Sequence, residues 1–313
     1  MAEKSHGMPW KRSIDPTYTS ATFSNDQNNN NNNSKDGQLP FMPFWEAQLS
    51  FMKENLTNLR ALPVESASRR DLSYMEGKPN KKKNNMIRVH TLLFESDEYR
   101  RIRITVWDAG KESQIFTSLC YPHAHSDLPI LGVNMMQFGQ TKHICAVDFQ
   151  PLYNQDDDTE SRLLDASRYD HLLAPIRNQY PSLQNPLNPR VYDGNQFFSS
   201  KTLLGRFDVT LANNDDDQDN GNNTNTKNDL RSMMFEDLLP AFKAYMETHA
   251  ELIRSTPSNH SDQFRRGVME RQRNFEAFFE ARDPTHAALA KHFGEDFAND
   301  FLFDVHFPLL EKR

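Results

Sequence analysis

Long apolar runs, paired cysteines and closely spaced glycines are all missing from this 313-residue sequence. No apolar run reaches the ~18 residues of a membrane span, so we expect no membrane helix. The N-terminus has no apolar core of a secretory signal and carries an early acid, which also argues against a transit peptide. The two cysteines, Cys120 and Cys145, form no CxxC pair, which excludes an iron–sulfur or zinc-knuckle site. Both lie in predicted strands, and we expect buried thiols.

Common catalytic motifs are absent as well. The 11 glycines are never two apart, so the chain has no G-x-G phosphate loop, and no G-x-S-x-G elbow occurs. His123 and His125 form an H-x-H in a turn without a carboxylate ligand set, so we predict no metal site. The net charge of −7 argues against a general nucleic-acid binder.

Two segments are too polar to bury an apolar core. Residues 1–40 contain an asparagine run, and residues 213–229 are rich in Asn and Asp without apolar residues. Such composition cannot offset the entropy of ordering, so we predict disorder in both. Residues 41–313 are then predicted to form a single domain that carries the second segment as an insert.

Alternating and helical patterns follow one another in this domain. Ile102, Ile104 and Val106 alternate with polar residues, as in a strand with one apolar face. The connections between the strands are too short for crossover helices, so neighbours should be antiparallel. Apolar residues at helical spacing come before and after the strands. We therefore predict a three-layer α/β/α sandwich with a central antiparallel sheet. The predicted strands cover 87–94, 99–108, 115–121, 130–138, 143–149 and 197–211, and the helices begin at Pro43, Ser161, Leu238, Val268, Thr285 and Phe297.

Several motifs then occur in a recognisable order. DAG is followed by LPILGVNMMQFG, AVDFQPL, FFSS and ARDPTHAAL. In this order they resemble the ferredoxin-dependent bilin reductases, above all the members that convert biliverdin to 15,16-dihydrobiliverdin. The resemblance covers residues 44–303 and implies the same sandwich fold. It also implies an oxidoreductase acting on CH–CH groups in phycobilin biosynthesis, without tightly bound cofactor or metal.

Reduction of a bilin needs two electrons and two protons. Ferredoxin would supply the electrons one at a time, which implies bilin radicals, and a carboxylic acid near the bilin must supply protons. Asp283 matches the acid before proline that the family uses next to the bilin. Asp before Pro is also a typical helix start, so Asp283 can equally be a cap. The two roles are compatible.

The sheet position beneath the bilin differs from the family pattern. The dihydrobiliverdin-forming members have an aspartate after Gly-Val, where this chain has Asn134. A phytochromobilin-forming plant branch also has Asn, with an Asp on the preceding strand, where this chain has Thr117. Asn134 can hydrogen-bond a pyrrole but cannot deliver a proton. It can equally be a sheet residue that satisfies its neighbours.

Other matching positions suggest substrate contacts. Arg206 falls where the family has a basic residue near a bilin propionate, and a surface ion pair is the alternative. Ser199 and Ser200 could donate to the same carboxylate or simply be solvated at a strand end. We expect Asp108 to serve a turn and Asp148 to cap backbone amides.

The expected partners are biliverdin or a related bilin and ferredoxin, and we expect a monomer. The basic clusters Lys81–Lys83 and Arg100–Arg103 are either solvated faces or a patch for an acidic partner. Ferredoxin and bilins imply a plastid or a cyanobacterial-type cytoplasm. The alternatives are a bilin reductase of other regiospecificity, forming phycoerythrobilin or phytochromobilin, a non-catalytic bilin carrier, and a plain interaction protein.

Overall fold

A computed structural model describes residues 41–62, 74–76, 87–109, 112–139, 141–184, 197–208 and 232–312. The disorder predicted for 1–40 and 213–229 and the basic cluster Lys81–Lys83 lie outside these residues. Within the described part of the chain, no helix is both long and apolar enough to cross a membrane.

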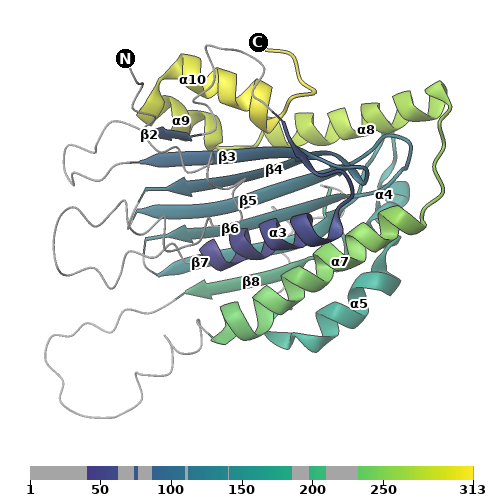
Figure 1. Ribbon diagram of the computed structural model, residues 1–313, viewed down its shortest axis with the longest axis horizontal. Coiled ribbons are helices and arrows are strands. Elements are labelled where there is room, and N and C mark those ends of the chain that lie inside the picture. Colours follow the sequence, from purple (N-terminus) through teal and green to yellow (C-terminus); the bar gives the residue numbers. More distant parts are fainter. Residues whose placement is uncertain are drawn as a thin grey trace, which may run out of the picture.

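One antiparallel sheet of eight strands forms the centre of the fold (Figure 1). Its order is β1-β3-β4-β5-β6-β7-β8, and β2 pairs with β3. Each strand from β3 to β8 therefore lies next to its neighbour in the chain, and for β3 to β7 the short connections predicted this arrangement. The strands are β1 (Arg60–Ala61), β2 (Tyr74–Glu76), β3 (Arg88–Glu95), β4 (Tyr99–Asp108), β5 (Ser113–Pro122), β6 (Ile130–Phe138), β7 (Lys142–Gln150) and β8 (Leu203–Asp208).

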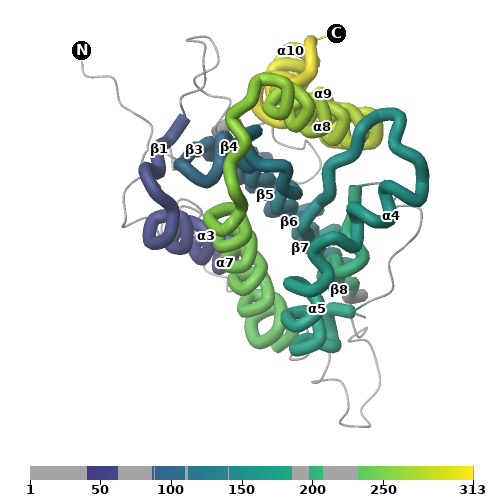
Figure 2. Tube along the Cα trace, turned by 90° about the vertical axis from the view of Figure 1, so that its right-hand side faces the viewer, coloured from purple at the N-terminus to yellow at the C-terminus, as the bar shows by residue number. Residues whose placement is uncertain are grey.

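Helices cover both faces of this sheet, which confirms the predicted three-layer sandwich (Figure 2). We call the face toward α3 and α7 the first face and the opposite one the second face. The C-terminal helices α8, α9 and α10 lie on the other side of the sheet from α3 and α7 (Figure 2). The helical elements are α3 (Met42–Asn55), α4 (Thr159–Ser167), α5 (Asp170–Gln179), η2 (Pro181–Leu183), η4 (Met233–Leu238), α7 (Leu239–Ser255), α8 (Asp262–Glu280), α9 (Thr285–Phe293), α10 (Glu295–Asp300) and η5 (Phe301–His306).

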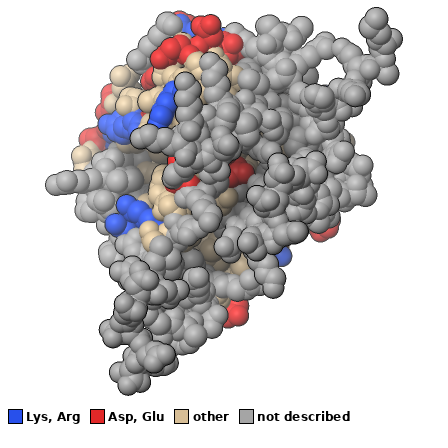
Figure 3. Space-filling model, turned by 90° about the vertical axis from the view of Figure 1, so that its left-hand side faces the viewer, with Lys and Arg blue, Asp and Glu red and all other residues tan. Residues whose placement is uncertain are grey.

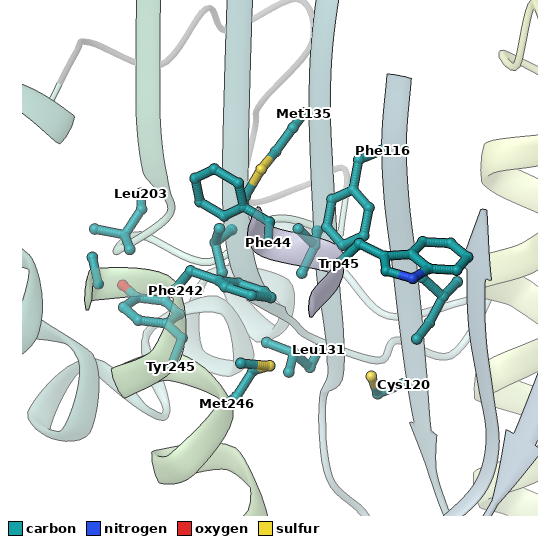
Figure 4. Close-up of a cluster of buried hydrophobic side chains, with 14 of the residues drawn as sticks. Phe44, Trp45, Phe116, Cys120, Leu131, Met135, Leu203, Phe242, Tyr245 and Met246 are labelled. Atoms are coloured by element: carbon teal, nitrogen blue, oxygen red, sulfur yellow. The ribbon is translucent and has the colours of Figure 1, made fainter. Parts of the chain in front are cut away.

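The first face carries the main apolar core. Phe44 and Trp45 of α3 and Phe242 and Met246 of α7 point toward Phe116, Leu131 and Met135 of the sheet (Figure 4). The Phe242 ring lies 5.7 Å from that of Phe44 and 6.4 Å from that of Phe116. The alternation of apolar residues along β4 to β7 thus buries one face completely.

Two smaller clusters hold the C-terminal layer on the second face. Val89 and Leu93 of β3 pack against Leu289, Ala298 and Phe301. At the strand ends, Tyr121 and Ile130 pack with Phe197 and Phe275. The layer is therefore attached at the β3 edge and at one end of the sheet.

The helix predicted to begin at Ser161 and stop at Pro181 is two helices, α4 and α5. The carbonyl of Ala166 accepts a hydrogen bond from the Ser200 amide, 3.2 Å away, instead of continuing the helix. The strand predicted for 197–211 is shorter in its described part and begins at Leu203. Phe197 has a φ of 64°, and the Ser199 amide donates to the Asp148 side chain, so neither residue continues the ladder. Residues 209–211 lie outside the described part of the chain.

Candidate active site

The strand register aligns Thr105, Thr117, Asn134, Ala146 and Leu204 in one row across the second face. Asn134 stands directly opposite Thr117 on β5 and Ala146 on β7. Directly opposite residues in antiparallel strands have Cβ atoms about 4.5–5.5 Å apart, so Asn134 and Thr117 can contact one ligand together. The two positions singled out from the sequence are therefore neighbours.

The middle of the second face is accessible between the two clusters that hold the C-terminal layer. Asn134 and Arg206 are exposed, whereas Ile115, Thr117, Met136 and Ile144 are half-buried. Arg206 lies on β8, opposite Ile144 and two strands from β6, a lateral separation of about 10 Å. We call these six residues the open face. Apolar side chains with a few polar ones at the edges suit a flat apolar ligand that carries charged groups.

Asp283 lies between α8 and α9, beside this face. Its Oδ1 accepts a hydrogen bond from the Thr285 amide at 2.8 Å, and its Oδ2 lies 2.9 Å from His306 Nε2. The Asp283 side chain is 18% exposed and that of His306 is 9% exposed. Asp283 therefore caps the first amide of α9 from one residue before the N-cap position, which is Pro284 and not Asp283 as predicted, and it also forms a shielded pair with a histidine.

Arg103 connects this pair to the sheet. Its Nη1 contacts His306 Nδ1, and its Nη2 donates to Thr117 Oγ1 at 3.3 Å. Arg103 is only 1% exposed, and burial lowers its pKa to about 10, which keeps it charged at neutral pH. Asp283, His306, Arg103 and Thr117 thus form a continuous polar chain that ends beside Asn134.

The arginine cluster on β4 is neither the solvated face nor the partner patch that were expected from the sequence. Arg100 Nε donates to Gln272 Oε1 at 2.6 Å, and Arg101 Nη2 donates to the carbonyls of Asp304 and Val305 at 3.2 and 3.1 Å. Together with Arg103, these side chains bind the C-terminal layer to the sheet. A solvated face or a partner patch at this cluster was the wrong interpretation, because a second layer covers the polar side of β4.

Glu276 of α8 lies in the same buried region. It is fully buried, its Oε2 accepts from the Leu309 amide at 2.7 Å, and burial raises its pKa to about 7. The folded chain therefore favours the neutral acid. This group costs no stability below the ordinary glutamate pKa of 4.5, and it increasingly destabilises the fold as the pH rises through 7.

We expect Glu276→Gln to be more stable than the wild type at pH 8.5, because the amide cannot ionise. The gain in free energy of unfolding should be on the order of 2–3 kcal/mol and should vanish near pH 4.5. Urea unfolding at several pH values measures it, with Glu270→Gln on the exposed side of α8 as control. A stability difference that does not change with pH would contradict this prediction.

Gly132, in the LPILGVN motif, leaves room for a side chain that lies across the second face. A Cβ at this position would come within 2.2 Å of Gln150 Oε1. That oxygen is buried and has no hydrogen-bond partner among the described residues. A side chain at position 132, two residues from Asn134 along β6, would therefore have to displace the end of the Gln150 side chain.

The two serines lie apart from the open face. Ser199 is buried, and both its amide and its hydroxyl donate to the Asp148 carboxylate. Ser200 Oγ donates to Asp170 at 2.6 Å. Both hydroxyls are thus engaged within the chain, so their suggested binding of a ligand carboxylate would require these contacts to change. Asp148 accepts a backbone amide as expected, and burial raises its pKa to about 6.

Metal and thiol chemistry find no support in the described residues, where no group of three or more His, Cys, Asp or Glu side chains could hold a metal ion. His123 Nε2 instead donates to the Ser96 carbonyl at 2.9 Å. Cys120 and Cys145 are buried free thiols, as expected, and burial raises the pKa of each to about 12.

A separate depression near Asp127 is too small for a large ligand. It encloses about 100 Å³ and is bordered by Arg168 and Arg271, which both pair with Asp127. Sites for drug-sized ligands typically measure about 300–1,000 Å³. The open face is the better candidate site.

Sequence reasoning missed Arg103 and His306. Arg103 occupies a polar position of an alternating strand, which normally indicates solvent. His306 belongs to an otherwise apolar helical segment and meets Arg103 across 203 residues of sequence. In the sequence, Arg103 was noticeable only as a charge and His306 only as an imidazole, each within a segment whose apolar residues indicate a buried layer.

The comparisons with known proteins concern the chain as a whole. The model of the family described as ferredoxin-dependent bilin reductase matches residues 53–308. Over 274 residues the chain is 28% identical to 15,16-dihydrobiliverdin:ferredoxin oxidoreductase of Nostoc punctiforme, covering 86% of this chain and 96% of that protein. It is 29% identical to the protein of the same name from Synechococcus sp. (strain CC9605), covering 87% and 100%.

A solved structure shows the same fold. Phytochromobilin synthase from tomato, in complex with biliverdin, superimposes with a TM-score of 0.58, covering 86% of this chain and 84% of that one. The sequence identity is 18%, so this likeness concerns the fold alone.

Proposed function

Because the chain belongs to the ferredoxin-dependent bilin reductase family, we propose that it reduces biliverdin IXα to 15,16-dihydrobiliverdin with electrons from reduced ferredoxin. The chain is an oxidoreductase of this family. The relatives named for this reaction support the choice of substrate and product. The structural observation that carries the proposal is the Asp283–His306 pair, which stands beside the open face of the sheet.

The bilin would lie on the open face over β5 to β8. The half-buried side chains of Ile115, Met136 and Ile144 offer an apolar platform, and Asn134 offers both a donor and an acceptor to pyrrole and lactam groups. Arg206, at the outer strand, suits a propionate because a guanidinium binds carboxylates with two parallel hydrogen bonds.

The reaction adds two electrons and two protons across one carbon–carbon double bond. Ferredoxin supplies the electrons singly, and the bilin carries the unpaired electron between them. Each added electron makes the tetrapyrrole more basic, so a positioned acid can then protonate it. We assign this role to Asp283, because His306 and Arg103 connect its carboxyl group to Thr117 of the open face.

The regiochemistry depends on how the bilin lies over Asn134. Neither Asn134 nor Thr117 can donate a proton at accessible pH, so we assign the protonation of the reacting carbon to Asp283. The absence of an acid from both positions also favours a second candidate, a bilin carrier without turnover. Reduction at another position, forming phytochromobilin or phycoerythrobilin, is the alternative within the family.

The test is an anaerobic assay with purified chain, biliverdin and a reduced ferredoxin system, followed by absorbance and product chromatography. We expect a product that co-elutes with 15,16-dihydrobiliverdin. A bound but unchanged biliverdin would favour the carrier, and a product of another elution would assign a different regiospecificity.

We expect Asn134→Asp to slow biliverdin reduction about fivefold and to change the product distribution. The carboxylate removes the amide donor to the bilin, and the loss of one hydrogen bond is worth about 1 kcal/mol. Initial rates and product chromatography measure both effects, with the exposed Asn178→Asp on α5 as control. If an inactive wild type became active through this substitution, the carrier function would be the correct one.

An acidic electron carrier would avoid the outer side of the C-terminal helices. Figure 3 shows acidic side chains gathered at the top of that view, where α9 and α10 lie. On this side, Lys312 pairs with Asp300 and Asp304 at 2.9 and 3.0 Å. We place the ferredoxin footprint elsewhere, with Lys81–Lys83 still a prediction. We further propose a monomer in a plastid or a cyanobacterial-type cytoplasm, which the cyanobacterial relatives support.

A further inference from the structure

His306 lies between Asp283 and Arg103. Its Nε2 lies 2.9 Å from Asp283 Oδ2 and 3.1 Å from Arg103 Nη1, whereas its Nδ1 has Arg103 Nη1 as its one hydrogen-bond partner among the described residues. A guanidinium can only donate hydrogen bonds, so the nitrogen that faces it must accept. Nδ1 is therefore unprotonated, and Nε2 carries the hydrogen that is donated to Asp283.

This tautomer fixes the orientation of the Asp283 carboxyl group. Its Oδ2 accepts the Nε2–H group of His306 and its Oδ1 accepts the Thr285 amide, so both oxygens are held and each keeps one lone pair. On the basis of the proposed function, we propose that His306, with its tautomer set by Arg103, is a positioning residue that holds the Asp283 carboxyl group in the orientation from which it transfers its proton.

The surroundings argue against His306 as the proton carrier itself. The fixed charge of Arg103 beside the ring disfavours a second positive charge there. Arg101 on β4 adds to this positive charge around Arg103, and the other titratable groups near Arg103 are Asp283 itself, Tyr121 on β5 and Glu276 on α8. Burial favours the neutral forms of Tyr121 and Glu276. His306 therefore acts as a neutral donor toward Asp283.

Two substitutions separate positioning from proton transfer. Glutamine places an N–H donor near the position of Nε2 and cannot carry a proton, and leucine has no donor. We expect His306→Gln to keep kcat for biliverdin within about threefold of the wild type. His306→Leu should lower kcat about 10–100-fold with little change in KM, because a displaced acid transfers its proton poorly.

The pH profile gives a readout that loss of packing would not change. A hydrogen bond to a carboxylate favours the ionised form, so its removal in His306→Leu favours the acid. The pH at which kcat falls to half should then rise by about one unit. His123→Gln, which replaces a distant histidine bound to a carbonyl, serves as control and should leave the profile unchanged.

Each other outcome overturns the proposal. If glutamine and leucine both abolished turnover, His306 would itself carry the proton. If both variants matched the wild type, His306 would have no role in the reaction. If His306→Leu fails to bind biliverdin, Arg103→Met is used in its place. Arg103→Met should lower kcat when it is introduced into the wild type. It should cause no further loss in His306→Gln, where no histidine tautomer remains to be set.

A measurement without turnover distinguishes failure of this inference from failure of the proposed function. Nitrogen-15 NMR of histidine-labelled chain, with the His306 signals assigned by their absence in His306→Gln, should show the neutral Nε2–H tautomer at pH 7. A neutral Nδ1–H ring or an imidazolium would contradict the inference even in an active enzyme. An inactive wild type with the expected tautomer would instead contradict the proposed function alone.

Discussion

Replacement of Asp283 by asparagine is expected to leave biliverdin bound and to lower its turnover by about 10²–10⁴-fold. The amide has the shape of the carboxyl group and keeps one of its acceptors for His306 or the Thr285 amide, but it has no proton to give. The absorbance of the bound bilin reports binding, and anaerobic initial rates report turnover.

Asp158 offers a matched control for the same substitution at a helix cap. It accepts from the Ser161 amide at 2.8 Å, the same distance as in the Asp283 cap, and lies at the start of α4. Because asparagine and aspartate cap helices about equally well, Asp158→Asn should change the stability little and keep full turnover. Wild-type rates in Asp283→Asn would show that Asp283 is a cap and that another group donates the proton.

Replacement of Phe242 by alanine should lower the free energy of unfolding by about 3–5 kcal/mol. The ring is fully buried between α7 and the first face of the sheet, where it contacts Phe44 and Phe116 (Figure 4). Its removal leaves a cavity that rigid neighbours cannot fill. Urea unfolding measures the loss.

The same variant also tests whether the first face serves stability alone while the second face carries the reaction. Because Phe242 lies on the first face, the folded fraction of Phe242→Ala should reduce biliverdin at nearly the wild-type rate. Leu164→Ala, at a 67% exposed position of α4, should change stability by no more than about 0.5 kcal/mol. A stability loss below about 1 kcal/mol in Phe242→Ala would mean that α7 is not held by this contact.

The sheet was predictable because its first face is buried without interruption. Ile102, Ile104 and Val106 alternate with polar residues, and a shift of one residue would expose all three. Short connections then required antiparallel neighbours. The placement of Asn134 beside Thr117 follows from this register, although only the resemblance to a family gave either residue a function.

The second face was less predictable, because a polar residue beneath a second layer has the same sequence pattern as one in water. Arg103 is the example, since its neighbours Arg101 and Thr105 made the strand resemble a solvated edge. Its partner His306 belongs to the last helical turn, and only the folded chain brings the two together. The break between α4 and α5 has a similar origin, because the Ser200 amide that ends α4 comes from a distant loop.

The most direct test of the account is a crystal structure of the chain with biliverdin. We predict that the tetrapyrrole lies on the open face, with Arg206 at a propionate, Asn134 beneath the pyrrole rings and a carboxyl oxygen of Asp283 within about 3.5 Å of the bilin. A bilin bound on the other side of the sheet, or with Asp283 turned away from it, would contradict the proposed mechanism.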